Sequence, residues 1–260
     1  MSKVKAKKYL GQHFLTDRNI AEKIVNALTD RTGIILEIGP GMGVLTDFLF
    51  TKFGENLFLT EIDPESVAYL NEHFPQLSNN ISETDFLKED LSKRFSEPFS
   101  IIGNFPYNIS SQIFFKILDQ RDSVPQVVCM IQKEVAERIA TGPGSKMYGI
   151  LSVLLQTFYD IEYLFTVHEN VFSPPPKVKS AVIRLNRNER KRLSCDEKLF
   201  FRVVKATFLH RRKTIRNTIK SIPHNFEAIT GHEFMSKRPE QLSVEQFEEL
   251  TLLVQNNPQA

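Results

Sequence analysis

The segment Gly-Asn-Phe-Pro-Tyr, residues 103–107, follows an apolar run and is the most specific chemical signal in the chain. The side-chain carbonyl of Asn104 and the backbone carbonyl of Phe105 can accept the two hydrogens of an exocyclic amine. In adenine N6 the lone pair is delocalised into the ring, and such acceptors recover it. Pro106 fixes φ and has no N–H, so it can keep the carbonyls directed inward, and Tyr107 can stack on the base. The segment predicts a site that makes an aromatic amine nucleophilic.

Methyl transfer to such an amine depends on orientation more than on proton transfer. Holding the amine in line with a sulfonium methyl, and stabilising the charge that moves from sulfur to nitrogen, supplies most of the rate. The methylated ammonium is acidic and loses its proton to solvent, so no catalytic His is required. In the alternative interpretation, Asn104 caps the next helix and Tyr107 belongs to the core.

A glycine-rich turn, residues 37–43, follows the first predicted strand, where open α/β sheets bind nucleotide-like ligands. Gly39 and Gly41 allow the backbone to approach a ligand closely. Val44 occupies the place of the last glycine of a dinucleotide-binding motif, which favours S-adenosylmethionine over NAD and disfavours a nicotinamide oxidoreductase. Taken alone, the glycines are also compatible with a simple tight turn.

Two acids follow at the ends of the next predicted strands. Glu61 stands about twenty residues after the glycines, where a carboxylate can accept hydrogen bonds from both ribose hydroxyls of an adenosyl group. We assign its neighbour Ile62 to the same site. Asp85 is placed to accept from the adenine amine, while Phe86 covers the ring. Either acid could instead be an ordinary strand-end residue, but together with the glycines they predict an S-adenosylmethionine site.

A base that is stacked or paired cannot reach this pocket, so the enzyme must extrude it or select an unpaired one. A flipped base needs a second aromatic wall. We predict that Phe172 is this wall, because it precedes the rigid run Pro174-Pro175-Pro176, with Lys177 nearby for a phosphate. On the local pattern alone, Phe172 is equally compatible with a core position.

Strand-like and helix-like segments alternate through the first part of the chain, which predicts an α/β fold with a parallel sheet and helices on both faces. The predicted strands are residues 34–38, 57–61, 81–84, 99–103 and 126–131, with late strands at 165–171 and 180–185. The predicted helices are residues 19–28, 44–53, 64–74, 110–118, 134–141 and 148–159. Helical periodicity returns at 197–208, 213–222 and 244–254. We therefore predict a catalytic domain over 1–187 and a small all-helical domain over 188–260.

Composition limits the classes of function. The chain has 260 residues, 41% hydrophobic and 25% charged, which is typical of a globular protein. No apolar run is long enough to span a membrane, the start has no signal-like core, and no Cys/His cluster predicts a metal site. We expect a cytoplasmic monomer without metal.

Positive charge is concentrated in residues 198–220, which contain eight Lys or Arg and no Asp or Glu. This pattern suggests a polyanionic partner, although it is also compatible with a solvated helix face. Arg211, Arg212, Lys213 and Arg216 are the candidates for salt-sensitive phosphate contacts that recognise RNA shape rather than sequence.

Several segments together resemble the ribosomal RNA adenine dimethyltransferase family: residues 9–15, 37–43, 85–86, 104–107 and 172–178. The resemblance runs over nearly the whole chain and implies a Rossmann-like class I methyltransferase fold with S-adenosylmethionine as cofactor. It implies cofactor contacts at Gln12, His13 and Leu15, in a segment that closes over the cofactor, and at Gly39, Glu61, Asp85 and Asn104. His13 stands where many members have Asn, and Phe105 where Leu or Ile is usual.

The C-terminal segments 208–217 and 238–243, together with 148–153, resemble the housekeeping branch that acts on small-subunit RNA. By that resemblance the substrate is a pair of adjacent adenines in a hairpin loop near the 3′ end of 16S rRNA, in an immature 30S particle, each adenine taking two methyl groups. Two alternatives are a large-subunit (23S) rRNA methyltransferase that confers antibiotic resistance and a ribosome-assembly factor whose binding matters more than its chemistry.

Overall fold

A computed structural model of the chain describes residues 4–29 and 33–259, and it forms two compact units. The sheet unit runs to Ala136 and resumes over Asp160–Arg187. The helical unit comprises Glu137–Tyr159 and the chain from Asn188 onward. The division after Arg187 coincides with the predicted boundary, but residues 137–159 group with the helical unit rather than with the catalytic domain. The reason is the helix α7, Ile150–Phe158, which is buried on most sides and packs on α8, Glu197–Leu209.

A seven-stranded sheet organises the sheet unit, in the order β4-β3-β2-β5-β6-β9-β7. Its strands are β2 (Ile35–Ile38), β3 (Leu57–Glu61), β4 (Ile81–Glu83), β5 (Ser100–Asn104), β6 (Gln126–Gln132), β7 (Tyr159–Val167) and β9 (Ser180–Arg187). The strands β2 to β6 pair in parallel, whereas β9 runs antiparallel to β6. The sheet is therefore mixed and not parallel throughout, as in doubly wound folds that carry an antiparallel addition at one side.

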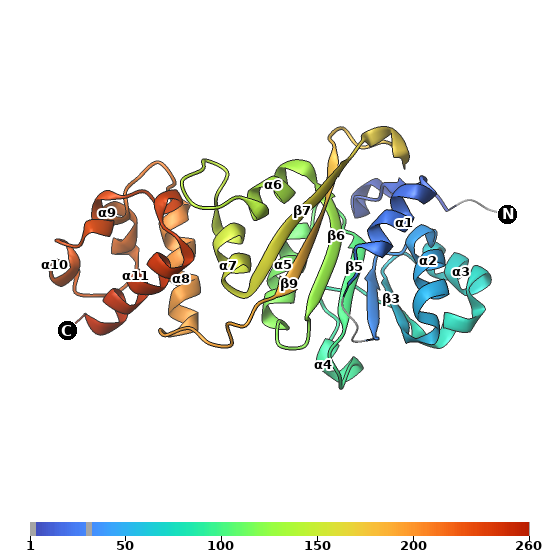
Figure 1. Ribbon diagram of the computed structural model, residues 1–260, viewed down its shortest axis with the longest axis horizontal. Helices are drawn as coiled ribbons and strands as arrows, with labels where there is room; N and C mark the ends of the chain where they lie inside the picture. The colour runs from blue at the N-terminus through green and yellow to red at the C-terminus, as the bar shows by residue number, and fades with distance from the viewer. Residues whose placement is uncertain (1–3, 30–32, 260) are drawn as a thin grey trace. The chain divides into compact units, whose positions relative to one another are not determined.

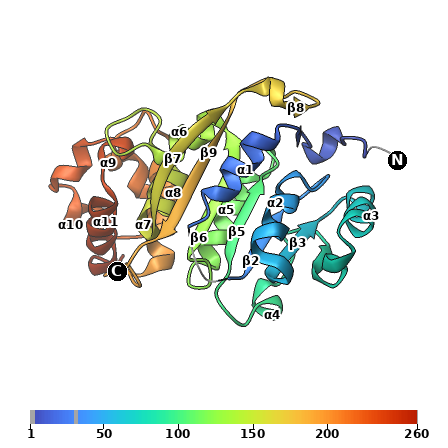
Figure 2. The same cartoon turned by 45° about the vertical axis from the view of Figure 1, so that its right-hand side comes forward.

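Helices cover both faces of this sheet, which confirms the predicted α/β class (Figures 1 and 2). They are α1 (Arg18–Asn26), α2 (Val44–Phe53), α3 (Pro64–His73), α4 (Leu91–Arg94) and α5 (Ser110–Asp119). Helix α1 begins where the Asp17 carboxylate accepts from the Ile20 N–H, and Asp63 caps α3 in the same way ahead of Pro64. Among the described residues no helix is long and apolar enough to cross a membrane.

The sheet reverses its order between β2 and β5, so that a crevice opens at their carboxyl ends. Hydrogen bonds continue the ladders past the strand ends: the Gly39 N–H donates to the Thr60 carbonyl at 2.9 Å, and the Phe105 N–H to the Met130 carbonyl at 3.0 Å. The turns that follow the strands are therefore fixed to their neighbours, and the residues on them have defined positions.

The predicted strand at residues 165–171 is wrong in its bounds. Strand β7 begins at Tyr159, directly after α7, and ends at Val167, and a short 3-10 helix follows over Glu169–Val171. Hydrophobic residues alternate from Tyr159 to Val167, a period-2 pattern that is typical of a strand. This pattern follows the apolar helix without a break, so the sequence does not mark where the strand begins. Phe172–Ser173 forms β8, which pairs with β1, Phe14–Leu15, in a separate two-stranded sheet.

The helical unit contains α7, α8, α9 (Ile215–Thr218), α10 (Phe226–Ile229) and α11 (Val244–Asn256), while α6 (Lys133–Ala140) crosses the division between the units. Further 3-10 segments lie at Ile219–Ser221, Glu233–Ser236 and Pro239–Gln241. The single helix predicted over 213–222 is instead a short α-helix followed by a 3-10 turn, because Thr214 is an N-cap and the last turn tightens. Helix α11 begins with a capping box between Ser243 and Gln246.

Candidate active site

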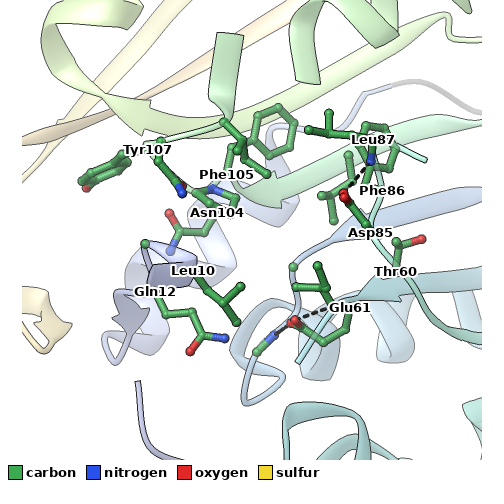
Figure 3. Close-up of a pocket in the computed structure, with 18 of the residues that line it drawn as sticks. Leu10, Gln12, Thr60, Glu61, Asp85, Phe86, Leu87, Asn104, Phe105 and Tyr107 are labelled. Atoms are coloured by element: carbon green, nitrogen blue, oxygen red, sulfur yellow. Dashed lines mark hydrogen bonds between the residues drawn. The ribbon is translucent and has the colours of Figure 1, made fainter. Parts of the chain in front are cut away.

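A pocket lies at the carboxyl ends of β2, β3 and β5 and is closed on one side by the N-terminal segment (Figure 3). The residues that line it are Tyr9, Leu10, Gly11, Gln12, His13, Phe14, Ile38, Gly39, Gly41, Thr60, Glu61, Ile62, Thr84, Asp85, Phe86, Leu87, Asn104, Phe105, Pro106, Tyr107, Asn108 and Ile109. The fold thus brings together the glycine turn, both strand-end acids and the Asn-Phe-Pro-Tyr segment, which are up to about seventy residues apart in the sequence.

The glycine turn has a backbone that only glycine adopts easily. Gly39 and Gly41 have φ of +65° and +56°. A Cβ on Gly41 would lie 2.7 Å from the ring of Phe14, whereas one on Gly39 would meet no atom within 4 Å. At Gly41 the glycine is needed for both conformation and space, and beside Gly39 there is open space for a ligand.

Glu61 ends β3 with its side chain almost fully buried. Its Oε2 accepts from the Gly41 N–H at 3.0 Å (Figure 3), and its Oε1 accepts from the N–H groups of Ile62 and Asp63, both at 2.9 Å. Burial raises the pKa of Glu61, and these backbone donors act in the opposite direction. The carboxylate ties the glycine turn to the end of β3, and Glu61 is one of the residues that line the pocket.

Asp85 and Phe86 lie on the turn after β4, beside Leu87 (Figure 3). The Asp85 Oδ1 accepts from the Leu87 N–H at 3.0 Å, which orients the carboxylate. The Lys116 ammonium lies 4.8 Å from the centre of the Phe86 ring and donates to the backbone carbonyls of Phe86 and Glu89. The Lys116 side chain therefore fixes this turn in place, a role that was not predicted from the sequence.

Asn104 is oriented by the N-terminal segment, because its Nδ2 donates to the His13 carbonyl at 2.9 Å. Its Oδ1 accepts no hydrogen bond from the part of the chain that the structure describes. Before it, Gly103 has no room for a side chain: a Cβ there would lie 2.5 Å from the Ile38 carbonyl oxygen. The side chain of Phe105 is buried, and the residue is part of the pocket lining. The alternative interpretation of Asn104 as a helix cap is wrong, since α5 begins at Ser110 without it.

Tyr107 follows with its ring half-buried at the edge of the pocket. Its hydroxyl lies 2.5 Å from the Ser180 Oγ, and its ring stacks on His13 with centroids 5.5 Å apart. Burial raises the pKa of Tyr107, against the hydrogen bond with Ser180. The Tyr107 phenol is therefore neutral, and its ring offers a flat surface rather than a proton-accepting group.

The N-terminal segment places its predicted residues unequally. Gln12 and His13 line the pocket, and the His13 Nδ1 lies 2.8 Å from the Pro174 carbonyl oxygen. Leu15 is buried in the hydrophobic core and lines only a small neighbouring hollow beneath the glycine turn. Leu15 therefore does not line the main pocket, and the cofactor contact expected at it stays a prediction.

Phe172 does not reach the pocket. It pairs with Leu15 across β1 and β8, is 4% exposed, and packs in the same core cluster. The prediction that the Phe172 ring forms a second aromatic wall is therefore wrong, because the pairing of β1 with β8 directs the ring into the hydrophobic core. A second hollow beside the pocket is lined by His13, Tyr107 and Gln132, with Pro174–Val178 forming its other wall. Lys177 is exposed at this wall.

The four predicted phosphate-binding cations belong to the helical unit. Arg212, Lys213 and Arg216 are exposed, and none of them forms an ion pair within the described residues. The Arg211 guanidinium differs, since it donates to the backbone carbonyls of Lys146 and Tyr148 and so ties the 142–149 loop to the end of α8. Arg216 donates to the Thr230 carbonyl at 2.9 Å but stays exposed, so Arg212, Lys213 and Arg216 are accessible to a polyanion, whereas Arg211 has a structural role.

Some residues that line the pocket were not predicted as site residues, among them Tyr9, Leu10, Thr60 and Leu87. Leu87 continues the Asp85-Phe86 turn, and that adjacency is a signal that could have identified it. Tyr9 is 76% exposed although it is aromatic, which no local pattern indicates. No group of three or more His, Cys, Asp or Glu in the described ranges could hold a metal ion.

The sequence matches known proteins over nearly its full length. A family model described as ribosomal RNA adenine dimethylase matches residues 3–255. Ribosomal RNA small subunit methyltransferase A of Parabacteroides distasonis is 59% identical over 258 residues, covering 99% of this chain and 97% of that protein. The protein of the same name from Cytophaga hutchinsonii is 58% identical over 254 residues, covering 96% of this chain and 98% of that protein.

Solved structures agree with these matches. A dimethyladenosine transferase from Plasmodium falciparum has a TM-score of 0.76 and 26% identity, covering 94% of this chain and 97% of that one. The 23S rRNA methyltransferase ErmE has a TM-score of 0.66 and 25% identity, covering 93% of this chain and 99% of that one. The predicted methyltransferase fold is confirmed, and the chain belongs to the ribosomal RNA adenine dimethylase family.

Proposed function

We propose that this protein is an S-adenosylmethionine-dependent enzyme that dimethylates the N6 amines of two adjacent adenines in a hairpin loop near the 3′ end of 16S rRNA. The observation that carries the proposal is the orientation of Asn104. Because its Nδ2 donates to the His13 carbonyl, its Oδ1 is left as an acceptor at the mouth of the pocket. An amide oxygen held in this way suits an N–H donor such as an adenine amine.

The pocket has the features that an adenosyl group requires. Glu61 presents buried carboxylate oxygens to ribose hydroxyls, and Asp85 presents a carboxylate to the adenine amine beside Phe86 and Ile62. Open space beside Gly39 allows the methionyl part to approach the backbone, with Gly41 and Gln12 next to it. S-adenosylmethionine, when bound, supplies the electrophilic methyl group.

The chain contributes orientation and charge stabilisation rather than acid or base catalysis. The Asn104 Oδ1 and the Phe105 carbonyl hold the two N6 hydrogens, which returns lone-pair density to the nitrogen. Pro106 keeps the backbone rigid at this point, and Tyr107 offers its ring to the base. The surplus proton leaves N6 for solvent, because the methylated ammonium is acidic and does not require a His or a carboxylate as proton acceptor.

The target base enters most directly through the second hollow, where Tyr107 and His13 are shared with the cofactor pocket. Lys177 at its rim supports a backbone phosphate. Arg212, Lys213 and Arg216 add phosphate contacts from the helical unit, in the salt-dependent way that RNA binding requires. The core position of Phe172 means that Tyr107 supplies the aromatic contact.

The small subunit is preferred over the large one because relatives at 58–59% identity carry small-subunit names, whereas ErmE, a 23S rRNA methyltransferase, is 25% identical. An immature 30S particle as substrate, a monomeric state and a cytoplasmic location belong to the same proposal. The assembly-factor alternative explains RNA binding, but it does not explain why the Asn104 amide is oriented by the His13 carbonyl.

The test is incubation of the protein with methyl-labelled S-adenosylmethionine and 30S particles that lack these methyl groups, followed by nucleoside analysis. We expect label in N6,N6-dimethyladenosine from 16S rRNA. Large-subunit particles are the matched control and should remain unlabelled. Label in 23S rRNA would support the resistance-type alternative, and no label in either RNA would contradict the proposal.

A further inference from the structure

Asp63 is a fully buried carboxylate in the sheet unit that the chemistry described above does not use. Its Oδ1 accepts from the Glu65 N–H at 3.1 Å, and its Oδ2 accepts from the Ser66 Oγ at 3.2 Å, which together cap α3. These contacts alone explain a local structural role. They do not explain why two side chains of the N-terminal segment also reach it.

Lys7 and Gln12 approach Asp63 from the N-terminal segment. The Lys7 ammonium donates to the Asp63 Oδ1, and the Gln12 Nε2 donates to the Oδ2 at 3.2 Å. The two donors are also joined to each other, because the Gln12 Oε1 accepts from the Lys7 backbone N–H at 2.8 Å. Burial opposes the charge on Asp63, but the hydrogen bonds from Lys7 and Gln12 outweigh it and keep the pKa of this carboxyl low. Asp63 is thus an anion that the N-terminal segment neutralises.

The backbone of the same residue reaches the cofactor pocket. The Asp63 N–H donates to the Glu61 Oε1 at 2.9 Å, and the Glu61 Oε2 holds the glycine turn through Gly41. One residue therefore joins two parts of the pocket, the N-terminal segment by its side chain and Glu61 by its N–H, to the start of α3, which it caps.

We infer that Asp63 is a positioning residue that couples closure of the N-terminal segment to cofactor binding. The segment carries pocket-lining residues, including Gln12 and His13, and His13 in turn orients Asn104. Because Lys7 and Gln12 fasten this segment to the loop that holds Glu61, the two walls of the cofactor pocket are set as one unit. The inference rests on the proposed use of S-adenosylmethionine and adds a residue that does not touch it.

The test is calorimetric binding of S-adenosylhomocysteine to the full chain and to Asp63→Asn and Lys7→Gln. Asn keeps the size of Asp63 but turns an N–H₂ group toward the Gln12 Nε2, whose amide cannot reverse because its Oε1 is already used. We expect binding about tenfold weaker in each variant, the scale of one lost charge-assisted hydrogen bond. Both variants break the Lys7–Asp63 pair, and Lys7→Gln also removes the ion pair with the exposed Glu65 carboxylate, so the loss in the double variant should be clearly less than the sum of the two single losses.

A second readout separates coupling from simple damage. Trypsin cleaves after Lys8, a site that every variant keeps, and in the parent saturating S-adenosylhomocysteine should slow this cleavage. In both variants the ligand should protect the bond after Lys8 several-fold less, even at concentrations that saturate binding. Lys7→Arg, which keeps the charge, should restore protection.

Arg18→Gln is the matched control, because it removes another ion pair of the early chain, with Asp47, in which both side chains are exposed. It should bind and be protected like the parent. Unchanged binding and protection in Lys7→Gln would overturn the inference, and so would additive losses in the double variant. If the parent itself does not bind S-adenosylhomocysteine, the proposed function fails instead.

Discussion

The functional charged side chains of the two units differ in burial and in hydrogen bonding. In the sheet unit, Glu61 and Asp63 are buried, and their oxygens receive hydrogen bonds from fixed backbone and side-chain donors. In the helical unit, Arg212, Lys213 and Arg216 are exposed and have no acidic partner among the described residues. The first arrangement fixes geometry, and the second leaves charge available to a mobile partner.

This difference separates chemistry from docking. A buried, oriented group acts at one point in a low-dielectric site, so its loss is large and insensitive to salt. Exposed cations act through release of counterions, so their losses are smaller, additive and dependent on ionic strength. Variants of the two regions should therefore differ in kind as well as in size.

Asn104→Ala should have the largest effect. It removes the acceptor that the His13 carbonyl orients, and loss of one such preorganised group typically lowers kcat by about 10²–10³-fold. The loss should appear in single-turnover methylation of 30S particles and remain the same from low to moderate salt. Asn71→Ala is a suitable control, because the Asn71 amide also donates to a backbone carbonyl, that of Val67, but lies on α3. An Asn104→Ala protein as fast as the parent would remove the chemical basis of the site.

Sequence reasoning identified the residues at strand ends well, for a physical reason. Parallel strands place their carboxyl ends at one edge, so Gly39, Glu61 and Asn104 had to converge once the alternation of strands and helices was recognised. Asp85 followed from the same rule. The glycine turn added conformational information, since φ is positive at Gly39 and Gly41.

Residues placed by long-range pairing were harder to predict. The direction of the Phe172 ring depends on β1 pairing with β8, which joins positions about 160 residues apart. The roles of Lys7, Gln12 and Lys116 depend on contacts that no local period encodes. The same limit applies to residues 137–159, whose helix is apolar on most sides and gives no sign of which unit it packs in.

Replacement of Arg212, Lys213 and Arg216 by Ala should have an intermediate effect that salt exposes. Each lost phosphate contact should lower the slope of log K against log salt by about 0.7–0.9, while S-adenosylhomocysteine affinity stays at the parental value. Filter binding of the 16S rRNA hairpin at several salt concentrations measures this slope. Lys88→Ala with Lys93→Ala is the control, since both lysines are exposed but lie beside acids of the sheet unit. An unchanged slope in the triple variant would place the RNA contacts elsewhere.

Arg211→Ala sharpens the same comparison within the basic cluster. Its guanidinium donates to the carbonyls of Lys146 and Tyr148, so it resembles the fixed groups of the sheet unit more than its neighbours do. We expect lower thermal stability, by the order of 1–3 kcal/mol typical of a lost charged hydrogen bond, with a smaller change in salt slope than for Arg212. A change in slope without a change in stability would return Arg211 to the docking surface.

Glu37 provides the most selective test, because it is a buried acid that no cation of the described residues neutralises. Burial raises its pKa from 4.5 to about 8, and nearby Glu61 adds to the rise, against a hydrogen bond from the Thr46 hydroxyl at 2.7 Å. The folded protein therefore holds a proton on Glu37 that the unfolded chain releases between these values. The parent should lose free energy of unfolding as pH rises from about 4.5 to 8, whereas Glu37→Gln, which cannot titrate, should not lose this part. Urea unfolding of both proteins at pH 5.5 and 8.5 measures the difference, which should move in favour of the variant at the higher pH. Parallel curves would mean that Glu37 is already ionised in the folded state, and that the sheet unit tolerates an unpaired buried charge beside Glu61.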